Sequence, residues 1–276
     1  MSPIETEGWV DPGRILYIDK PYRWTSFDVV NKVRWLLCKR LGTRKLKVGH
    51  AGTLDPLATG VMVVCTGRAT KRIDELQAQT KEYVATLRLG ATTPSFDLEH
   101  PIDAYYPTDH ITREQVEATL KTFLGPIQQI PPAYSAVKVD GKRAYDLARR
   151  EKDVELKPKL LVIDEIELVA CQLDCVVTNG TTQSSVIPRT GMRNKAFLTS
   201  PAVPEDAPEG YPSITIRVVC SKGTYIRALA RDIGQALGSG AHLTALRRTR
   251  VGDVRVEDCL PMDTFPDWLE QQPMIT

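Results

Sequence analysis

Residues 49–61 read GHAGTLDPLATGV, and this stretch says more about the fold than any other part of the chain. Its three glycines favour tightly turned backbone, and the apolar residues 61–66 that follow predict a strand. Asp55 is therefore expected on a loop between regular elements, where catalytic groups often lie. Asp-Pro in a turn also has a local use, because Asp accepts backbone hydrogen bonds and Pro fixes φ. The spacing leaves both interpretations open.

Strands and helices are expected to alternate irregularly on both sides of this loop. Residues 81–89 show the period of a half-buried strand, with Tyr83, Ala85, Leu87 and Leu89 on one face. We expect strands over residues 14–19, 61–66, 81–89, 160–170, 214–220 and 243–251, and helices over 25–41, 69–79, 112–124, 144–150 and 224–237. Several connections are too short for a parallel crossover. The pattern predicts an α+β fold, a mixed and mostly antiparallel sheet flanked by helices.

The composition is that of an ordinary globular protein: 276 residues, 42% hydrophobic and 25% charged. No apolar run is long enough for a membrane span, and the first residues lack a signal-peptide pattern, so we expect a cytoplasmic protein. The six cysteines include no CxxC pair, and the four histidines are scattered. We therefore expect no metal site.

Positive charge is concentrated in two segments. Residues 31–50 hold seven Lys or Arg and no acid, and residues 221–250 hold six against one Asp. If the fold brings the two together, they predict a face that binds a polyanion. Otherwise they are solvated helix faces.

Single residues outside the glycine-rich loop remain ambiguous. Arg227 follows Gly223 at the expected start of a helix, where it suits either an anion or an ordinary surface position. Tyr83 suits the core or a stacked base, and His50 suits a local hydrogen bond or an RNA contact.

Residues 49–61 resemble the signature of the TruB family of pseudouridine synthases, which act on uridine 55 of bacterial tRNA. Further family motifs occur in the same order across residues 14–250: Asp19-Lys20-Pro21 with Thr25-Ser26, Lys81-Glu82-Tyr83, Pro131-Pro132-Ala133-Tyr134-Ser135-Ala136, Gly223-Thr224-Tyr225-Ile226-Arg227 and Leu246-Arg247-Arg248. The resemblance implies a pseudouridine-synthase-like fold. It also implies an isomerase, without cofactor or metal, that converts the T-loop uridine of tRNA to pseudouridine on a flipped-out base.

The resemblance also implies roles for single residues. Asp55 would be the catalytic nucleophile, with attack on the ribose or on the uracil ring both open. Arg227 would pair with Asp55, and Tyr83 would stack on the uracil. The other implied substrate-binding residues are His50, Tyr225, Leu246 and Lys20.

For the domains, we expect a catalytic domain over 10–255, with a thumb-like insertion at about 127–155 and a flexible insertion at about 172–212. A short tail would follow over 256–276. The resemblance implies the T-arm of tRNA as partner, no membrane, and a monomer without an obligatory protein partner. The small C-terminal RNA-binding domain of many relatives is expected to be missing.

Two other functions compete with this one. A guide-RNA-dependent relative would need the C-terminal domain to hold its guide, and a tRNA chaperone would need no nucleophile. Asp55, Tyr83 and Arg227 together therefore favour the isomerase.

Overall fold

The computed structural model describes residues 8–135, 138–139, 142–143, 156–173 and 211–273. The predicted helix over 144–150 and most of the insertion expected over 172–212 lie outside the described residues, as does much of the thumb-like insertion.

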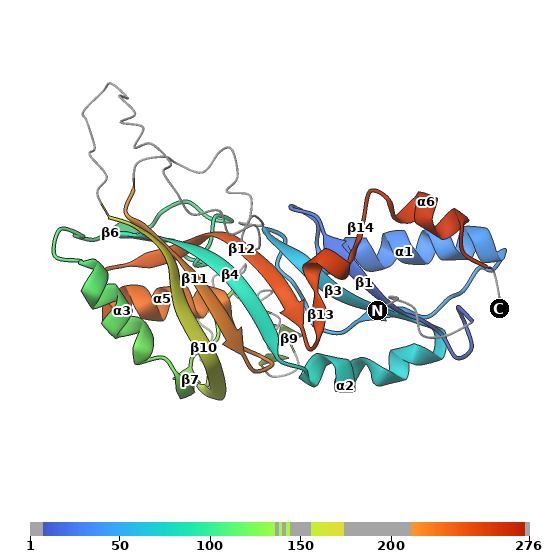
Figure 1. Ribbon diagram of the computed structural model, residues 1–276, viewed down its shortest axis with the longest axis horizontal. Helices are drawn as coiled ribbons and strands as arrows, with labels where there is room; N and C mark the ends of the chain where they lie inside the picture. The colour runs from blue at the N-terminus through green and yellow to red at the C-terminus, as the bar shows by residue number, and fades with distance from the viewer. Residues whose placement is uncertain (1–7, 136–137, 140–141, 144–155, 174–210, 274–276) are drawn as a thin grey trace, which may run out of the picture.

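One long sheet runs through the molecule (Figure 1). Its strands follow the order β14 (Leu260–Pro261), β1 (Ile15–Lys20), β3 (Ala58–Thr66), β12 (Ala241–Val251), β4 (Lys81–Leu89), β11 (Ser213–Cys220), β10 (Lys159–Gln172) and β7 (Gly125–Gln129), with β2 (Val48–His50) beside β3 and β13 (Val254–Arg255) beside β12. Among these described strands, β1 pairs with β14 and β3 with β12 in parallel, and the other pairings are antiparallel. The predicted α+β fold with a mostly antiparallel sheet is confirmed.

Helices flank both ends of this sheet. α1 (Ser26–Leu41) and α6 (Phe265–Glu270) lie at one end, and α3 (Arg113–Lys121) and α5 (Ile226–Ala236) at the other (Figure 1). The remaining described elements are the 3₁₀ helices η1 (Gly67–Arg72) and η2 (Val256–Asp258), α2 (Ile73–Ala78), and two small strand pairs, β5 (Ala91–Thr92) with β6 (Ala104–Tyr105) and β8 (Lys138–Val139) with β9 (Lys142–Arg143).

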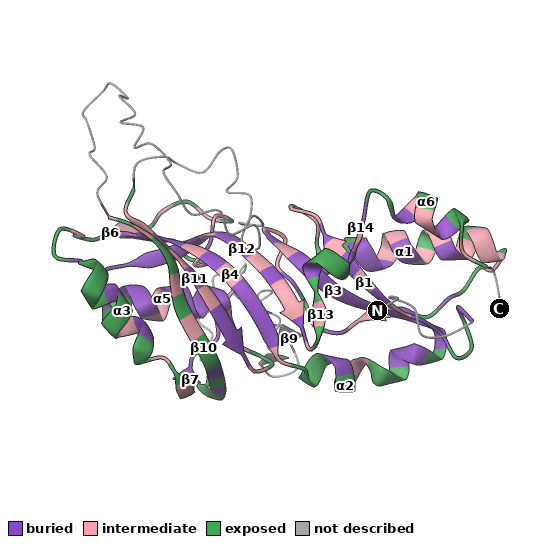
Figure 2. Cartoon of the chain, viewed as in Figure 1, coloured by how far each residue is buried: buried purple, intermediate pink, exposed green. Residues whose placement is uncertain are grey.

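Strand β3 is buried on both faces, which explains the apolar run over residues 61–65 (Figure 2). Met62 and Val64 pack in a core with α1 and α6, whereas Val61 and Val63 pack in a second core with η1 and α2. A third core joins α3 and α5 to β4, β10, β11 and β12. The loop before β3 thus stands on a strand that is fixed from both sides.

The helix α1 starts and ends at the predicted signals. Thr25 is the N-cap, and its side chain and that of Asp28 form a reciprocal capping box. Gly42 ends the helix in the left-handed conformation, with φ 62°. This cap places Ser26, the first residue of α1, beside the Asp55 loop.

The structure differs from the sequence prediction at three places. Residues 48–50, expected as a turn, form β2. Residues 127–129, expected in the thumb-like insertion, belong to the edge strand β7. Residues 256–276, expected as a short tail, contribute β14, which pairs with β1, and α6, which packs on α1.

Candidate active site

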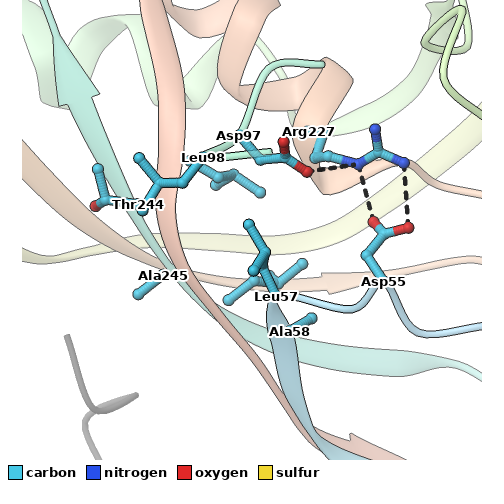
Figure 3. A pocket seen from close by; sticks show the side chains of 10 residues that line it. Asp55, Leu57, Ala58, Asp97, Leu98, Arg227, Thr244 and Ala245 are labelled. Atoms are coloured by element: carbon cyan, nitrogen blue, oxygen red, sulfur yellow. Dashed lines mark hydrogen bonds and ion pairs between the residues drawn. The ribbon is translucent and has the colours of Figure 1, made fainter. Parts of the chain in front are cut away.

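Asp55 and Arg227 form a two-point ion pair although 172 residues separate them in sequence. Arg227 Nε donates to Oδ2 at 2.9 Å, and Nη2 donates to Oδ1 at 3.1 Å (Figure 3). The Arg227 side chain is only 6% exposed, whereas that of Asp55 is 34% exposed. The carboxylate is therefore fixed on one side and accessible on another.

Arg227 is in turn held by further acceptors. Asp97 Oδ2 lies 3.6 Å from Nε, and Arg227 donates to the carbonyls of Ser95 at 3.1 Å and Tyr134 at 2.9 Å. Burial disfavours the positive charge, but the charges of Asp55 and Asp97 outweigh burial and raise the pKa of Arg227. Asp97, which was not predicted as a site residue, completes an acid–arginine–acid row (Figure 3).

The loop that carries Asp55 is clamped on both sides of that residue. Ser26 Oγ accepts a hydrogen bond from the Leu54 backbone N–H at 2.8 Å and donates to the Leu54 carbonyl at 2.9 Å. On the other side, the Arg23 backbone N–H donates to the Pro56 carbonyl at 2.9 Å. Asp55 is thus presented by backbone with little conformational freedom.

Lys20 lies beneath this loop rather than on an RNA-facing surface. Its side chain is fully buried, and Nζ donates to the carbonyls of Trp24 at 2.6 Å, Pro21 at 2.9 Å and Pro56 at 3.3 Å. Burial lowers the pKa of Lys20 to about 8, although the charge of Asp55 favours the ammonium form. The expected direct contact of Lys20 with substrate is therefore not available here, and Lys20 supports the loop instead.

Tyr83 and Arg248 face one another across β4 and β12. Burial raises the pKa of Tyr83, while the charge of Arg248 acts in the opposite direction, so the phenol is neutral near pH 7. Arg248 is 1% exposed and donates to the carbonyls of Val61 at 2.7 Å and Gly52 at 3.3 Å. Arg248 thereby ties the glycine-rich loop to β12.

Gly60 permits the close parallel contact of β3 with β12. It pairs with Arg248 and has φ 107°, which side chains rarely tolerate. A Cβ at this position would lie 2.1 Å from the Arg248 carbonyl oxygen. A glycine is therefore required where the two halves of the sheet meet.

His50 lies on β2 at the start of the same loop. It is half-buried, and burial lowers its pKa, so the imidazole is neutral near pH 7. Its Nδ1 is buried and has no hydrogen-bond partner among the described residues. No described contact joins His50 to Asp55.

Tyr225 is the N-cap of α5, and a buried glutamine fixes its backbone. Gln129, on β7, accepts from the Tyr225 N–H at 2.9 Å and donates to the Tyr225 carbonyl at 3.2 Å. Burial raises the pKa of Tyr225, and the charge of Asp55 acts in the same direction. Gln129 was not predicted from the sequence.

Leu246 on β12 pairs with Ala58 and lines a small cavity together with Asp55 and Arg227 (Figure 3). The cavity measures about 20 Å³, room for a single water molecule.

The second cationic segment does not form an open basic face. Arg247 pairs with Asp19 at 2.7 Å and Arg250 with Glu82 at 3.7 Å, while Arg227 and Arg248 are buried in the contacts described above. Most of this positive charge is therefore paired with acidic side chains or buried in hydrogen bonds within the protein.

The described residues show neither a metal-binding cluster nor a membrane-spanning helix. They contain no group of three or more His, Cys, Asp or Glu placed to bind a metal ion. They also contain no helix long and apolar enough to cross a membrane.

The arrangement of sheet and helices matches solved structures of pseudouridine synthases. A structure of a Cbf5–Nop10–Gar1 complex aligns with a TM-score of 0.59 and 26% identity, over 92% of this chain and 54% of that chain. The present chain thus spans about half the length of that protein. The class that fold and site define is the pseudouridine synthases.

Sequence comparison narrows this class. The model of the TruB family pseudouridylate synthase N-terminal domain matches residues 39–185, and that of the tRNA pseudouridylate synthase B C-terminal domain matches residues 227–273. The tRNA pseudouridine synthase B of Phocaeicola vulgatus is 62% identical over 94% of each chain, and that of Flavobacterium johnsoniae is 44% identical over 94% of this chain and 96% of that one. The chain belongs to the TruB family of pseudouridylate synthases.

Proposed function

We propose that the chain converts uridine 55 in the T-loop of tRNA to pseudouridine, with Asp55 as the nucleophile on a flipped-out base. The observation that carries the proposal is the Asp55 carboxylate, held through both oxygens by Arg227 yet 34% exposed. Curated relatives that match nearly the whole chain carry the name tRNA pseudouridine synthase B.

The reaction is an isomerisation that needs no external oxidant or reductant. The bond from ribose C1′ to uracil N1 breaks, the ring turns, and a bond from C1′ to C5 forms. C5 loses a proton and N1 gains one, so atoms and electrons balance. Asp55 supplies the electron pair that attacks the target nucleoside, and Arg227 stabilises the carboxylate before and after the attack.

The surroundings of Asp55 suit a base removed from its stack. Leu246 lines the cavity beside Asp55, while Tyr83, which is only 8% exposed, would stack on the uracil and Tyr225 would line the opposite side. Extruding the base costs a few kcal/mol, which stacking and phosphate contacts offset. Because Tyr83 is neutral, it can stack without introducing a charge.

The proposed substrate is recognised through its T-arm. His50, at the rim of the loop, would contact the nucleotides next to the extruded base. We further infer a cytoplasmic monomer that needs no metal, cofactor or protein partner.

The test uses tRNA transcripts that carry tritium at uridine C5, incubated with the protein in EDTA without added cofactor. The wild type should release tritium, and a transcript with cytidine at position 55 should release none from that site. Asp55→Asn keeps the size of the side chain but should lower the rate on the order of a thousandfold or more.

Binding measurements separate loss of chemistry from loss of substrate. Asp55→Asn should retain the tRNA affinity of the wild type. A wild type that binds tRNA but releases no tritium, or an Asp55→Asn variant with full activity, would overturn the proposal.

A further inference from the structure

A second charged hollow lies at the far end of β3 from Asp55. It has a volume of about 320 Å³, and it is lined by the loop after α1, by η1 and by the N-terminal segment. The nine residues of β3 separate it from the Asp55 loop, and the eight steps between the first and the last of them, at about 3.3 Å each, amount to ~26 Å. The hollow is therefore distinct from the proposed catalytic site.

Positive charge dominates this hollow. Four cations line it, Lys45, Lys47, Arg68 and Lys71, against the single acid Asp11. Asp11 pairs with Arg68 at 2.9 Å. No acid among the described residues pairs with any of the three lysines, in contrast to the arginines of residues 221–250.

The backbone around the hollow is fixed. The Gly67 N–H donates to the Lys47 carbonyl at 2.8 Å, and the Arg68 N–H donates to the Val10 carbonyl at 3.0 Å. Leu46 is buried in the core with α1, so Lys45 and Lys47 on either side of it both face solvent. The lysines are thus carried by backbone that hydrogen bonds hold in place.

We propose that this hollow binds backbone phosphates of the tRNA outside its T-arm. The inference rests on the proposed function, because it takes the occupant to be the same substrate RNA. Lysines are compact point charges that contact phosphates without reading bases. Three unpaired lysines on a surface wider than one phosphate suit successive phosphates of a polymer better than a single small anion. Duplex RNA rises less per base pair than the roughly 3.4 Å of B-form DNA, so ~26 Å corresponds to at least about eight base pairs, more than the stem of a minimal hairpin bound at Asp55.

The test compares full-length tRNA with an isolated T-arm stem-loop. The triple variant Lys45→Gln, Lys47→Gln, Lys71→Gln should weaken binding of full-length tRNA about tenfold at moderate salt, and it should reduce the slope of log affinity against log salt by two to three. Its affinity for the stem-loop and its tritium release from the stem-loop should match the wild type.

A matched control removes the same charge at the other end of the sheet. Lys121→Gln, Lys157→Gln, Lys159→Gln changes three exposed lysines on or near α3 and β10. An equal loss of tRNA affinity in the control would show a general effect of net charge and overturn the proposal. Unchanged binding of full-length tRNA by the first triple variant, or an equal loss with the stem-loop, would also overturn it.

The affinity comparison does not depend on whether the protein is catalytically active. A wild type that releases no tritium from either RNA would contradict the proposed function, while the affinity comparison would still decide whether the hollow binds RNA.

Discussion

At the residue scale, the hydrogen bonds of Ser26 to the Asp55 loop lead to a testable prediction. Its hydroxyl bonds both polar backbone atoms of Leu54, so Ser26→Ala releases one side of the loop. We expect kcat to fall about tenfold and the free energy of unfolding to fall by about 1–3 kcal/mol. Ser239→Ala is the matched control, because Ser239 is also buried and bonds a carbonyl distant from the site. It should lose stability and keep kcat; equal kcat losses would refute the clamp.

Lys20 should make stability depend on pH in the alkaline range. Its folded pKa of about 8 lies below the ordinary value of 10.5, so the unfolded chain binds more protons between these values. Stability from this residue therefore rises with pH from about 8 to 10.5, by at most about 1.4 kcal/mol per pH unit. Urea unfolding of Lys20→Met should show a smaller rise over that window than the wild type. Identical pH profiles would contradict the buried ammonium.

The residues proposed to carry the chemistry could be singled out from the sequence, whereas the residues that support them could not. Asp55 and Arg227 lie in long family motifs, and the structure brings them into contact across the fold. Gln129 and Asp97 act through backbone carbonyls, N–H groups and a shared arginine, contacts that only the fold creates. No spacing in the sequence predicts that Gln129 and Asp97 make these contacts.

At the scale of elements, Gln129 links β7 to the start of α5. Because Tyr225 lies two residues before Arg227, loss of this link should displace the Asp55–Arg227 pair. Gln129→Met should lower kcat about tenfold to a hundredfold with little change in KM for tRNA. Gln128→Met, at the exposed neighbouring position of β7, should leave both parameters unchanged. A change in KM alone would show that Gln129 serves RNA binding instead.

Element prediction succeeded where one physical signal dominated. The alternation of residues 81–89 gives β4 with its observed bounds, and the capping residues give α1. It failed at β2 and β14, which are too short to show a period. It also failed at α6, because Pro266 reads as a helix breaker although the first turn of a helix tolerates proline.

At the scale of the whole molecule, α6 contributes Phe265 and Leu269 to the core. Phe265 is fully buried between α1 and β1, so Phe265→Ala should reduce the free energy of unfolding by about 3–5 kcal/mol. Phe27→Ala is the control, because Phe27 on α1 is 64% exposed and should change stability by less than about 1 kcal/mol. Thermal unfolding measures both. Equal, small effects would mean that α6 is only loosely attached.

The separation of Asp55 from Arg227 has a consequence during protein synthesis. The two partners are 172 residues apart, so a ribosome making 5–20 residues per second finishes the arginine roughly 10–35 s after the aspartate. Throughout that interval the nascent chain contains the Asp55 loop without the cation that fixes it. The order of translation thus leaves the Asp55–Arg227 pair unformed until most of the polypeptide has been made.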